Sequence, residues 1–136
     1  MNKRNIIIAR ILMLLYIAAI ALLCFGHFDS LPKVSDSIFG IETDKLVHFA
    51  MFLPFPILAY FSTGTNPKGP WKALLIVLGI LLTGCIIAAA TEVVQSMIPD
   101  RDADTKDFFA DTLALGISSL AVFIIMLVKG TRASKQ

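Results

Sequence analysis

The sequence predicts an all-α integral membrane bundle of four transmembrane helices, formed by a single domain that covers residues 1–136. The first observation is composition: hydrophobic residues make up 57% of the chain, charged residues make up 16%, and the mean hydropathy is +0.79. Soluble domains average about 25% charged residues. The second observation is that the apolar residues form four continuous blocks instead of an amphipathic pattern, which is typical of membrane-spanning segments.

The first block, from Ile6 to Phe25, contains one charged residue, Arg10, and predicts a helix over about residues 6–26. A cleaved signal peptide is the alternative, because Lys3 and Arg4 precede the block and small residues within it resemble a cleavage site. The apolar stretch continues to Phe25, however, which is too long for a signal peptide. We therefore expect this segment to stay in the membrane.

The second block, from Leu46 to Tyr60, is shorter, contains His48 and carries two prolines, Pro54 and Pro56. Membrane helices tolerate proline where neighbouring groups satisfy the carbonyls that proline leaves without a donor. We therefore expect a short, proline-kinked second helix over about residues 45–62. A re-entrant segment is the alternative.

The third and fourth blocks are the most uniform. No charged residue occurs from Ala73 to Ala90, and Asp111 is the one ionisable residue from Phe108 to Val128. These blocks predict helices over about residues 71–97 and 106–129. At ~1.5 Å of rise per residue, both are long enough to cross the ~30 Å hydrocarbon core of a bilayer.

Charged residues predict the orientation of the bundle. Four helices place both termini and the connection between the second and third helices on one side, whose cations are Lys3, Arg4, Lys68, Lys72, Lys129, Arg132 and Lys135. The cations of the other side are fewer: Lys33, Lys45, Arg101 and Lys106. Because cytoplasmic segments carry the excess of lysine and arginine, we expect a multi-pass protein with both termini in the cytoplasm.

Polar residues gather at the helix ends that meet the non-cytoplasmic side. Asp44 and His48 are four residues apart and share a helical face, and Glu92 and Gln95, three apart, share another. The full set of ligand-binding candidates is Asp44, Lys45, His48, Glu92, Gln95, Arg101, Asp104, Asp107 and Asp111. A carboxylate exposed to lipid costs on the order of several kcal/mol. We therefore expect Glu92 and Asp111 to face the bundle interior or a wet cavity.

The same residues have purely structural interpretations, which stay open at this point. Asp104 and Asp107 are suited to cap the last helix, where its dipole favours anions. His48 could be a polar residue between helices, and Arg101 a surface cation. A pair between Glu92 and either Arg101 or His48 could simply hold the bundle together.

Three motifs carry a resemblance to a known family: Asp44-Lys45-x-x-His48-Phe49, Glu92-x-x-Gln95 and Arg101-x-x-Asp104-x-x-Asp107. In order, spacing and membrane placement they resemble the VanZ-like family of small bacterial membrane proteins, whose pattern is DKxxHF, ExxQ and RxxDxxD. The likeness covers about Asp44 to Gly116. This chain has Asp111 where the family usually has asparagine, and Ala114 where a glycine is common.

The resemblance implies a protein of the bacterial cytoplasmic membrane, and the name-giving member is associated with low-level resistance to the glycopeptide teicoplanin. The first functional hypothesis is therefore a site that binds a lipid head group, a lipid-linked cell-wall precursor or a glycopeptide. Arg101 would hold a phosphate or carboxylate, while His48, Glu92 and Gln95 would hydrogen-bond to it. Membrane lipids would be its partners, and an oligomer is compatible with this hypothesis.

Two other functions remain open, so the sequence leaves it uncertain whether the chain is an enzyme. His48, Glu92 and Asp107 are candidates for acid–base catalysis on an envelope lipid or precursor. A divalent cation is a candidate cofactor, with His48, Glu92, Asp107 and Asp111 as candidate ligands. A small transporter ranks third, because the first helix offers only Arg10 and the cytoplasmic halves of the third and fourth helices contain no acid. Nucleic-acid binding is not expected, since the cations are scattered at helix ends.

Overall fold

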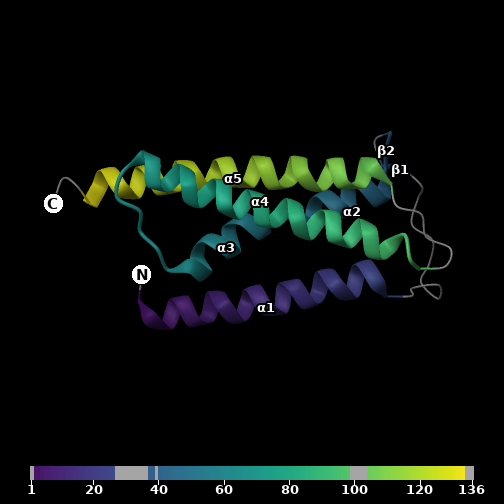
Figure 1. The fold of residues 1–136 in the computed structure, drawn as a ribbon, viewed down its shortest axis with the longest axis horizontal. Helices are drawn as coiled ribbons and strands as arrows, with labels where there is room; N and C mark the ends of the chain where they lie inside the picture. The colour runs from purple at the N-terminus through teal and green to yellow at the C-terminus, as the bar shows by residue number, and fades with distance from the viewer. Residues whose placement is uncertain (1, 27–36, 39, 99–103, 134–136) are drawn as a thin grey trace.

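A computed structural model describes residues 2–26, 37–38, 40–98 and 104–133. Along the chain these form α1 (Lys3–Phe25), β1 (Ser37–Ile38), β2 (Ile41–Glu42), α2 (Thr43–Phe52), α3 (Phe55–Thr63), α4 (Pro70–Gln95) and α5 (Thr105–Ala133) (Figure 1). Four helical segments are long and apolar enough to cross a membrane, with α2 and α3 together as the second, Thr43–Thr63. This confirms the prediction of an all-α bundle of four spans, in a multi-pass membrane protein.

The second span breaks where the prolines lie. Pro54 has no N–H, so α2 ends at Phe52, and α3 begins at Phe55 with a proline in its first turn. The backbone stays close to helical across the break, because Leu53 N–H still donates to the Phe49 carbonyl at 3.1 Å. The Tyr16 hydroxyl of α1 donates to the Met51 carbonyl beside the break. The predicted kink is thus supported by a side chain from a neighbouring helix.

The two short strands were not expected from the sequence. β1 and β2 are two residues long and pair antiparallel, with Ser37 opposite Glu42. Gly40 lies between them with φ +79°, a conformation that favours glycine. The hairpin leads directly into α2 and brings Glu42 to the start of that helix.

The helices meet through a core of buried apolar side chains that includes Phe52, Phe55, Leu115, Val122 and Met126. α4 approaches α5 closely at Gly84, where a Cβ atom would lie 2.6 Å from Leu115 Cδ2. Small residues allow such approaches between membrane helices. Most of the remaining large apolar side chains, such as Leu14, Leu82 and Ile124, are exposed on the outside, as helices surrounded by lipid require.

α1 is the peripheral helix of the bundle. It contacts α3 and α4, and 11% of its span is buried against 39% of the span in α5. Arg10 Nε donates to the Ser62 carbonyl at 3.1 Å, and Ser62 Oγ donates back to the Ala9 carbonyl at 3.1 Å. α1 begins and α5 ends at one end of the molecule, whereas the hairpin lies at the other (Figure 1). We call the hairpin end the site end.

Candidate functional site

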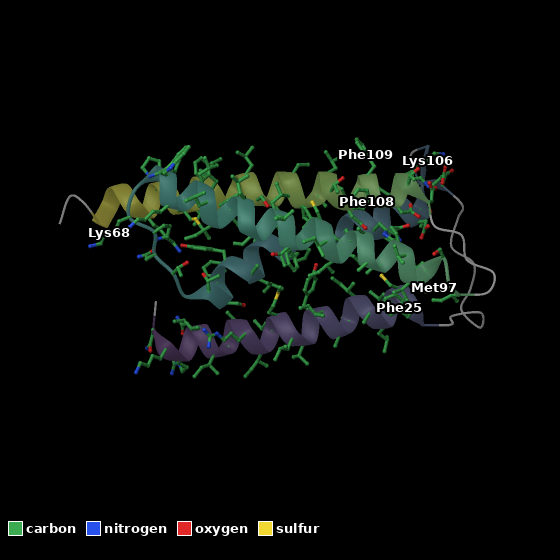
Figure 2. All side chains as sticks on the ribbon, viewed as in Figure 1. Phe25, Lys68, Met97, Lys106, Phe108 and Phe109 are labelled. Carbon is green, nitrogen blue, oxygen red and sulfur yellow. The ribbon has the colours of Figure 1, made fainter. Side chains whose placement is uncertain are left out.

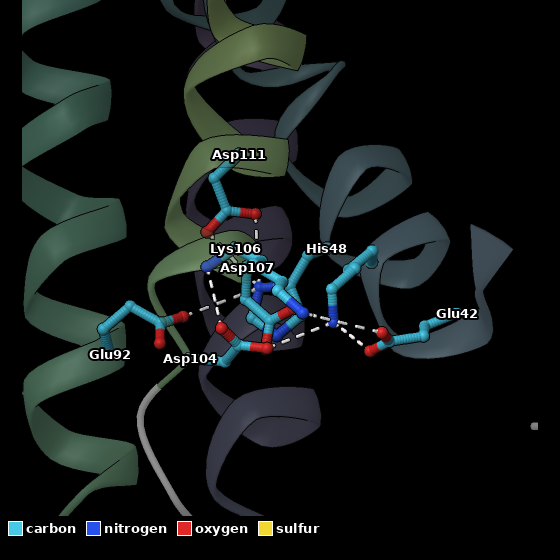
Figure 3. Close-up of polar contacts among 8 residues, drawn as sticks. Glu42, His48, Glu92, Asp104, Lys106, Asp107 and Asp111 are labelled. Atoms are coloured by element: carbon cyan, nitrogen blue, oxygen red, sulfur yellow. Dashed lines mark hydrogen bonds and ion pairs between the residues drawn. The ribbon is translucent and has the colours of Figure 1, made fainter.

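Three helix termini bring polar side chains together at the site end. Asp44 and Lys45 lie in the first turn of α2, with His48 one turn further along. Glu92 lies in the last turn of α4, while Asp107 lies in the first turn of α5 with Asp111 one turn on. In Figure 3 the side chains of Glu92, His48 and Asp111 converge from these three helices.

The centre of the cluster is the imidazole of His48. Its Nδ1 lies 3.2 Å from Oδ1 and 3.3 Å from Oδ2 of Asp111. The same Nδ1 lies 3.8 Å from Glu92 Oε1, within ion-pair range but beyond a hydrogen bond. His48 is 4% exposed, Asp111 0% and Glu92 8%. Buried polar groups this close together must form hydrogen bonds or ion pairs with one another, or with a bound ligand.

Lys45 forms the outer layer of the cluster. Its ammonium group bonds to the Glu42 carboxylate and to Asp104 Oδ2 at 3.2 Å, and it lies 3.6 Å from Asp107 Oδ1. Lys45 therefore joins the hairpin and α2 to the start of α5. Lys106 lies further out, with its Nζ 3.9 Å from Glu42 Oε1 and its side chain 69% exposed.

Asp104 has two roles in the structure. Its Oδ1 accepts a hydrogen bond from Lys106 N–H at 2.9 Å, which caps α5. That backbone hydrogen bond, together with the Lys45 ammonium group, holds the pKa of Asp104 below its ordinary value. The hydrogen bond from Lys45 likewise lowers the pKa of Glu42. Both outer carboxylates are therefore ionised at neutral pH.

Two buried carboxylate oxygens remain unsatisfied. Glu92 Oε1 and Asp107 Oδ1 have no hydrogen-bond partner within the described part of the chain. Two groups of possible metal ligands meet at His48: one with Glu92 and Asp111, the other with Asp44 and Asp107. In each group, one ligand atom from every residue lies within 4.8 Å of the others.

Two hollows reach the cluster from opposite sides of α5. A pocket of about 210 Å³ between α4 and α5 is lined by Ala89, Glu92, Asp104, Thr105 and Phe108. A larger groove of about 430 Å³ between α2 and α5 is lined by Lys45, Leu46, Phe49, Lys106, Phe109, Ala110 and Leu113. Lys106, Phe108 and Phe109 lie together near the site end (Figure 2). We call the larger hollow the α2–α5 groove.

Most of the predicted site residues are brought together, and two are not seen in the cluster. The residues that meet at the site end are Asp44, Lys45, His48, Glu92, Asp104, Asp107 and Asp111. Gln95 is buried but turns toward α1, where its Nε2 lies 3.5 Å from the Cys24 carbonyl. Arg101 lies outside the described residues.

Two exposed residues that are not among the predicted ligand-binding candidates also join the site. Glu42 binds Lys45 and approaches Lys106, so it connects the outer cations. The spacing of Glu42 three residues before Lys45 is the signal that could have indicated this pair. Lys106 follows Asp104 by two residues, and that spacing gave no comparable signal.

Comparisons with family models, with curated proteins and with solved structures give no match for this chain. The likeness to the VanZ-like family therefore stays a prediction from three motifs.

Chemically, the cluster has a surplus of negative charge. The described carboxylates at the site end are Glu42, Asp44, Glu92, Asp104, Asp107 and Asp111, and the described cations are Lys45 and Lys106, with His48 titratable. Such a surplus in a semi-buried site attracts cations. The His48–Asp111 pair also has the geometry in which a carboxylate orients an imidazole for proton transfer.

Proposed function

We propose that this chain is a VanZ-like protein of the bacterial cytoplasmic membrane that binds the polar head group of a lipid or lipid-linked envelope precursor. The α2–α5 groove is the observation that carries the proposal. Its walls are apolar along Leu46, Phe49 and Leu113, and lysines line it at the site end. An amphiphile presents the same order of groups, with an acyl chain below a charged head.

Lys106 is the residue suited to contact an anionic head group. Its side chain is 69% exposed, and its ion-pair contact with Glu42 is long at 3.9 Å. Lys45 is less available, because Glu42, Asp104 and Asp107 surround its ammonium group. A lysine ammonium binds phosphate as a point charge, so no fixed geometry is required of Lys106.

The acyl chain would lie against Phe109 and Ala110 of α5. Phe109 is 68% exposed and borders the groove, so it can cover part of a bound chain. The excess of cations at the other end of the bundle supports a non-cytoplasmic position for this site. There it would meet envelope precursors and glycopeptides, which would link binding to teicoplanin-type resistance.

The test is native mass spectrometry of the protein purified in mild detergent. Ala110→Phe fills the groove, and Lys106→Glu reverses the charge of its exposed cation. The matched controls are Ala121→Phe, at an exposed position of the same helix, and Lys72→Glu, at the other end of the bundle. We expect the wild type and both controls to retain a phospholipid or precursor that both groove variants lose. Equal retention by all five proteins would overturn the proposal.

The link to resistance has a separate test in cells. We expect expression of the wild type in a susceptible bacterium to raise the inhibitory concentration of teicoplanin, and Ala110→Phe to abolish the increase. Ala121→Phe provides the control for expression and insertion. If the groove variant protected as well as the wild type, resistance would not depend on the groove.

An enzyme is the second candidate function, and the His48–Asp111 pair favours it. Nδ1 of His48 is held by both oxygens of Asp111 at 3.2 and 3.3 Å, which leaves its other ring nitrogen for proton transfer. We expect an enzyme to convert a membrane-lipid extract to products detectable by mass spectrometry, and His48→Gln to prevent this. Unchanged lipid profiles with the wild type would exclude turnover of those lipids.

A further inference from the structure

We propose that His48, Glu92 and Asp111 hold a divalent transition-metal ion, of which Zn²⁺ is the best match, at the interior end of the polar cluster. This inference goes beyond head-group binding, because none of these three residues lines the α2–α5 groove. They come from α2, α4 and α5, so a bound ion would join three helices at one point (Figure 3).

Two distances within this group are compatible with those around a bound metal. His48 Nδ1 lies 3.2 Å from Asp111 Oδ1 and 3.8 Å from Glu92 Oε1. Two ligands at ~2.0–2.2 Å from a tetrahedral Zn²⁺ are separated by roughly 3.4 Å. The longer contact is a poor hydrogen bond but a suitable distance between two ligands of one ion.

Unsatisfied oxygens provide independent support for a ligand. Asp107 is 5% exposed and Glu92 is 8% exposed, and one oxygen of each has no hydrogen-bond partner among the described residues. A buried carboxylate oxygen without a hydrogen-bond donor is costly, so Glu92 Oε1 indicates a bound cation or proton, whereas Asp107 Oδ1 still has the Lys45 ammonium group at 3.6 Å. Asp107 belongs to the second group of possible ligands at His48, so its carboxylate lies in the same cluster as the proposed ion.

The charge balance favours a divalent ion over a further hydrogen bond. Lys45 lies within ion-pair range of Asp107, whereas the ion-pair contacts of Glu92 and Asp111 in the described structure are to His48. One imidazole cannot neutralise two carboxylates. A divalent cation bound by a neutral imidazole would neutralise both.

The types of ligand atom indicate which class of metal ion the site would bind. An imidazole nitrogen with carboxylate oxygens suits Zn²⁺ and its neighbours, whereas Ca²⁺ and Mg²⁺ prefer sites made of oxygen alone. The pocket between α4 and α5 is lined by Glu92 and Asp104, so one of the three proposed ligands borders a hollow.

The test uses the untagged full chain in detergent, delipidated, treated with chelator and titrated with ZnCl₂ by calorimetry. Metal content is measured in parallel by mass spectrometry. We expect one Zn²⁺ per chain, and a loss of affinity of at least roughly tenfold in Glu92→Gln and in His48→Gln. Glu42→Gln is the matched control, since Glu42 is a carboxylate at the same end but belongs to neither ligand group.

Circular dichroism establishes that each variant is folded, and Asp111→Asn offers a third ligand change with the least change in shape. The proposal would be overturned by a wild type that binds no stoichiometric Zn²⁺, or by ligand variants that bind as tightly as Glu42→Gln. Preference for Ca²⁺ or Mg²⁺ over Zn²⁺ would overturn the metal class. Ala110→Phe should keep full Zn²⁺ affinity, which separates failure of this inference from failure of the head-group proposal.

Discussion

At the scale of single residues, the pairing of His48 with Asp111 is the contact on which the interior of the site depends. Both side chains are buried, at 4% and 0% exposure. We expect Asp111→Ala to lower the free energy of unfolding by about 1–3 kcal/mol, because it leaves the imidazole without its acceptor. Asp111→Asn retains an acceptor oxygen and should lose less.

Denaturant titration in detergent after chelator treatment measures both Asp111 variants without any contribution from metal. Equal losses from Asp111→Ala and Asp111→Asn would show that the hydrogen bond itself stabilises nothing.

The lowered pKa of Asp104 predicts that the stability of the protein falls at acidic pH. Its pKa is held below the ordinary 3.8 by the Lys106 N–H and then by Lys45. A depressed carboxyl pKa contributes stability that is present above the unfolded value and lost as the pH falls through the folded value. We therefore expect the melting temperature to drop below about pH 3.8, and Asp104→Asn to flatten that drop. A variant as acid-sensitive as the wild type would assign the effect to other groups.

Helical spacing predicted part of the site. It failed where the position of a side chain depends on a second helix. The separation of four residues correctly predicted that Asp44 and His48 share a face, and both belong to the cluster. The same rule placed Gln95 beside Glu92, yet Gln95 turns toward Cys24 of α1. Spacing fixes neighbours on one helix, but it does not say which other helix a given face will meet.

At the scale of elements, the contact between α4 and α5 depends on Gly84. A Cβ at this position would lie 2.6 Å from Leu115 Cδ2 and 3.1 Å from Phe55 Cδ1, and both neighbours are buried. We expect Gly84→Ala to destabilise the bundle by about 1–3 kcal/mol through overpacking.

Gly79→Ala is the matched control on the same helix, because a Cβ there meets nothing within 4 Å. Both variants are compared by unfolding in detergent. A Gly84→Ala protein as stable as Gly79→Ala would mean that Leu115 can move aside at no cost.

Continuous apolar blocks predicted the four spans because hydrophobic length is set by the bilayer itself. Pro54 likewise indicated the break in the second span, since proline removes a backbone donor. The hairpin was missed, because strands of two residues are too short to show an alternating pattern. α1 also begins earlier than expected, at Lys3, where Asn2 accepts a hydrogen bond from Arg4 N–H.

At the scale of the whole molecule, charged side chains lie at both ends of the bundle. Lys68 lies at the opposite end from Met97 and Lys106 (Figure 2). α1 reaches the site end through its Cys24 carbonyl, which lies 3.5 Å from Gln95 Nε2. The orientation of the bundle in the membrane determines which molecules can reach the site.

The cation bias predicts that the site end is non-cytoplasmic, and labelling of single cysteines can test this. Met97 is 73% exposed at the site end, and Lys68 is exposed at the other. With Cys24 and Cys85 replaced by alanine, we expect a membrane-impermeant maleimide to label Met97→Cys on intact cells stripped of outer barriers. Lys68→Cys should react only after the membrane is permeabilised. The reverse pattern would put the carboxylate cluster in the cytoplasm, where it could meet neither a glycopeptide nor an exported precursor, although it could still bind Zn²⁺.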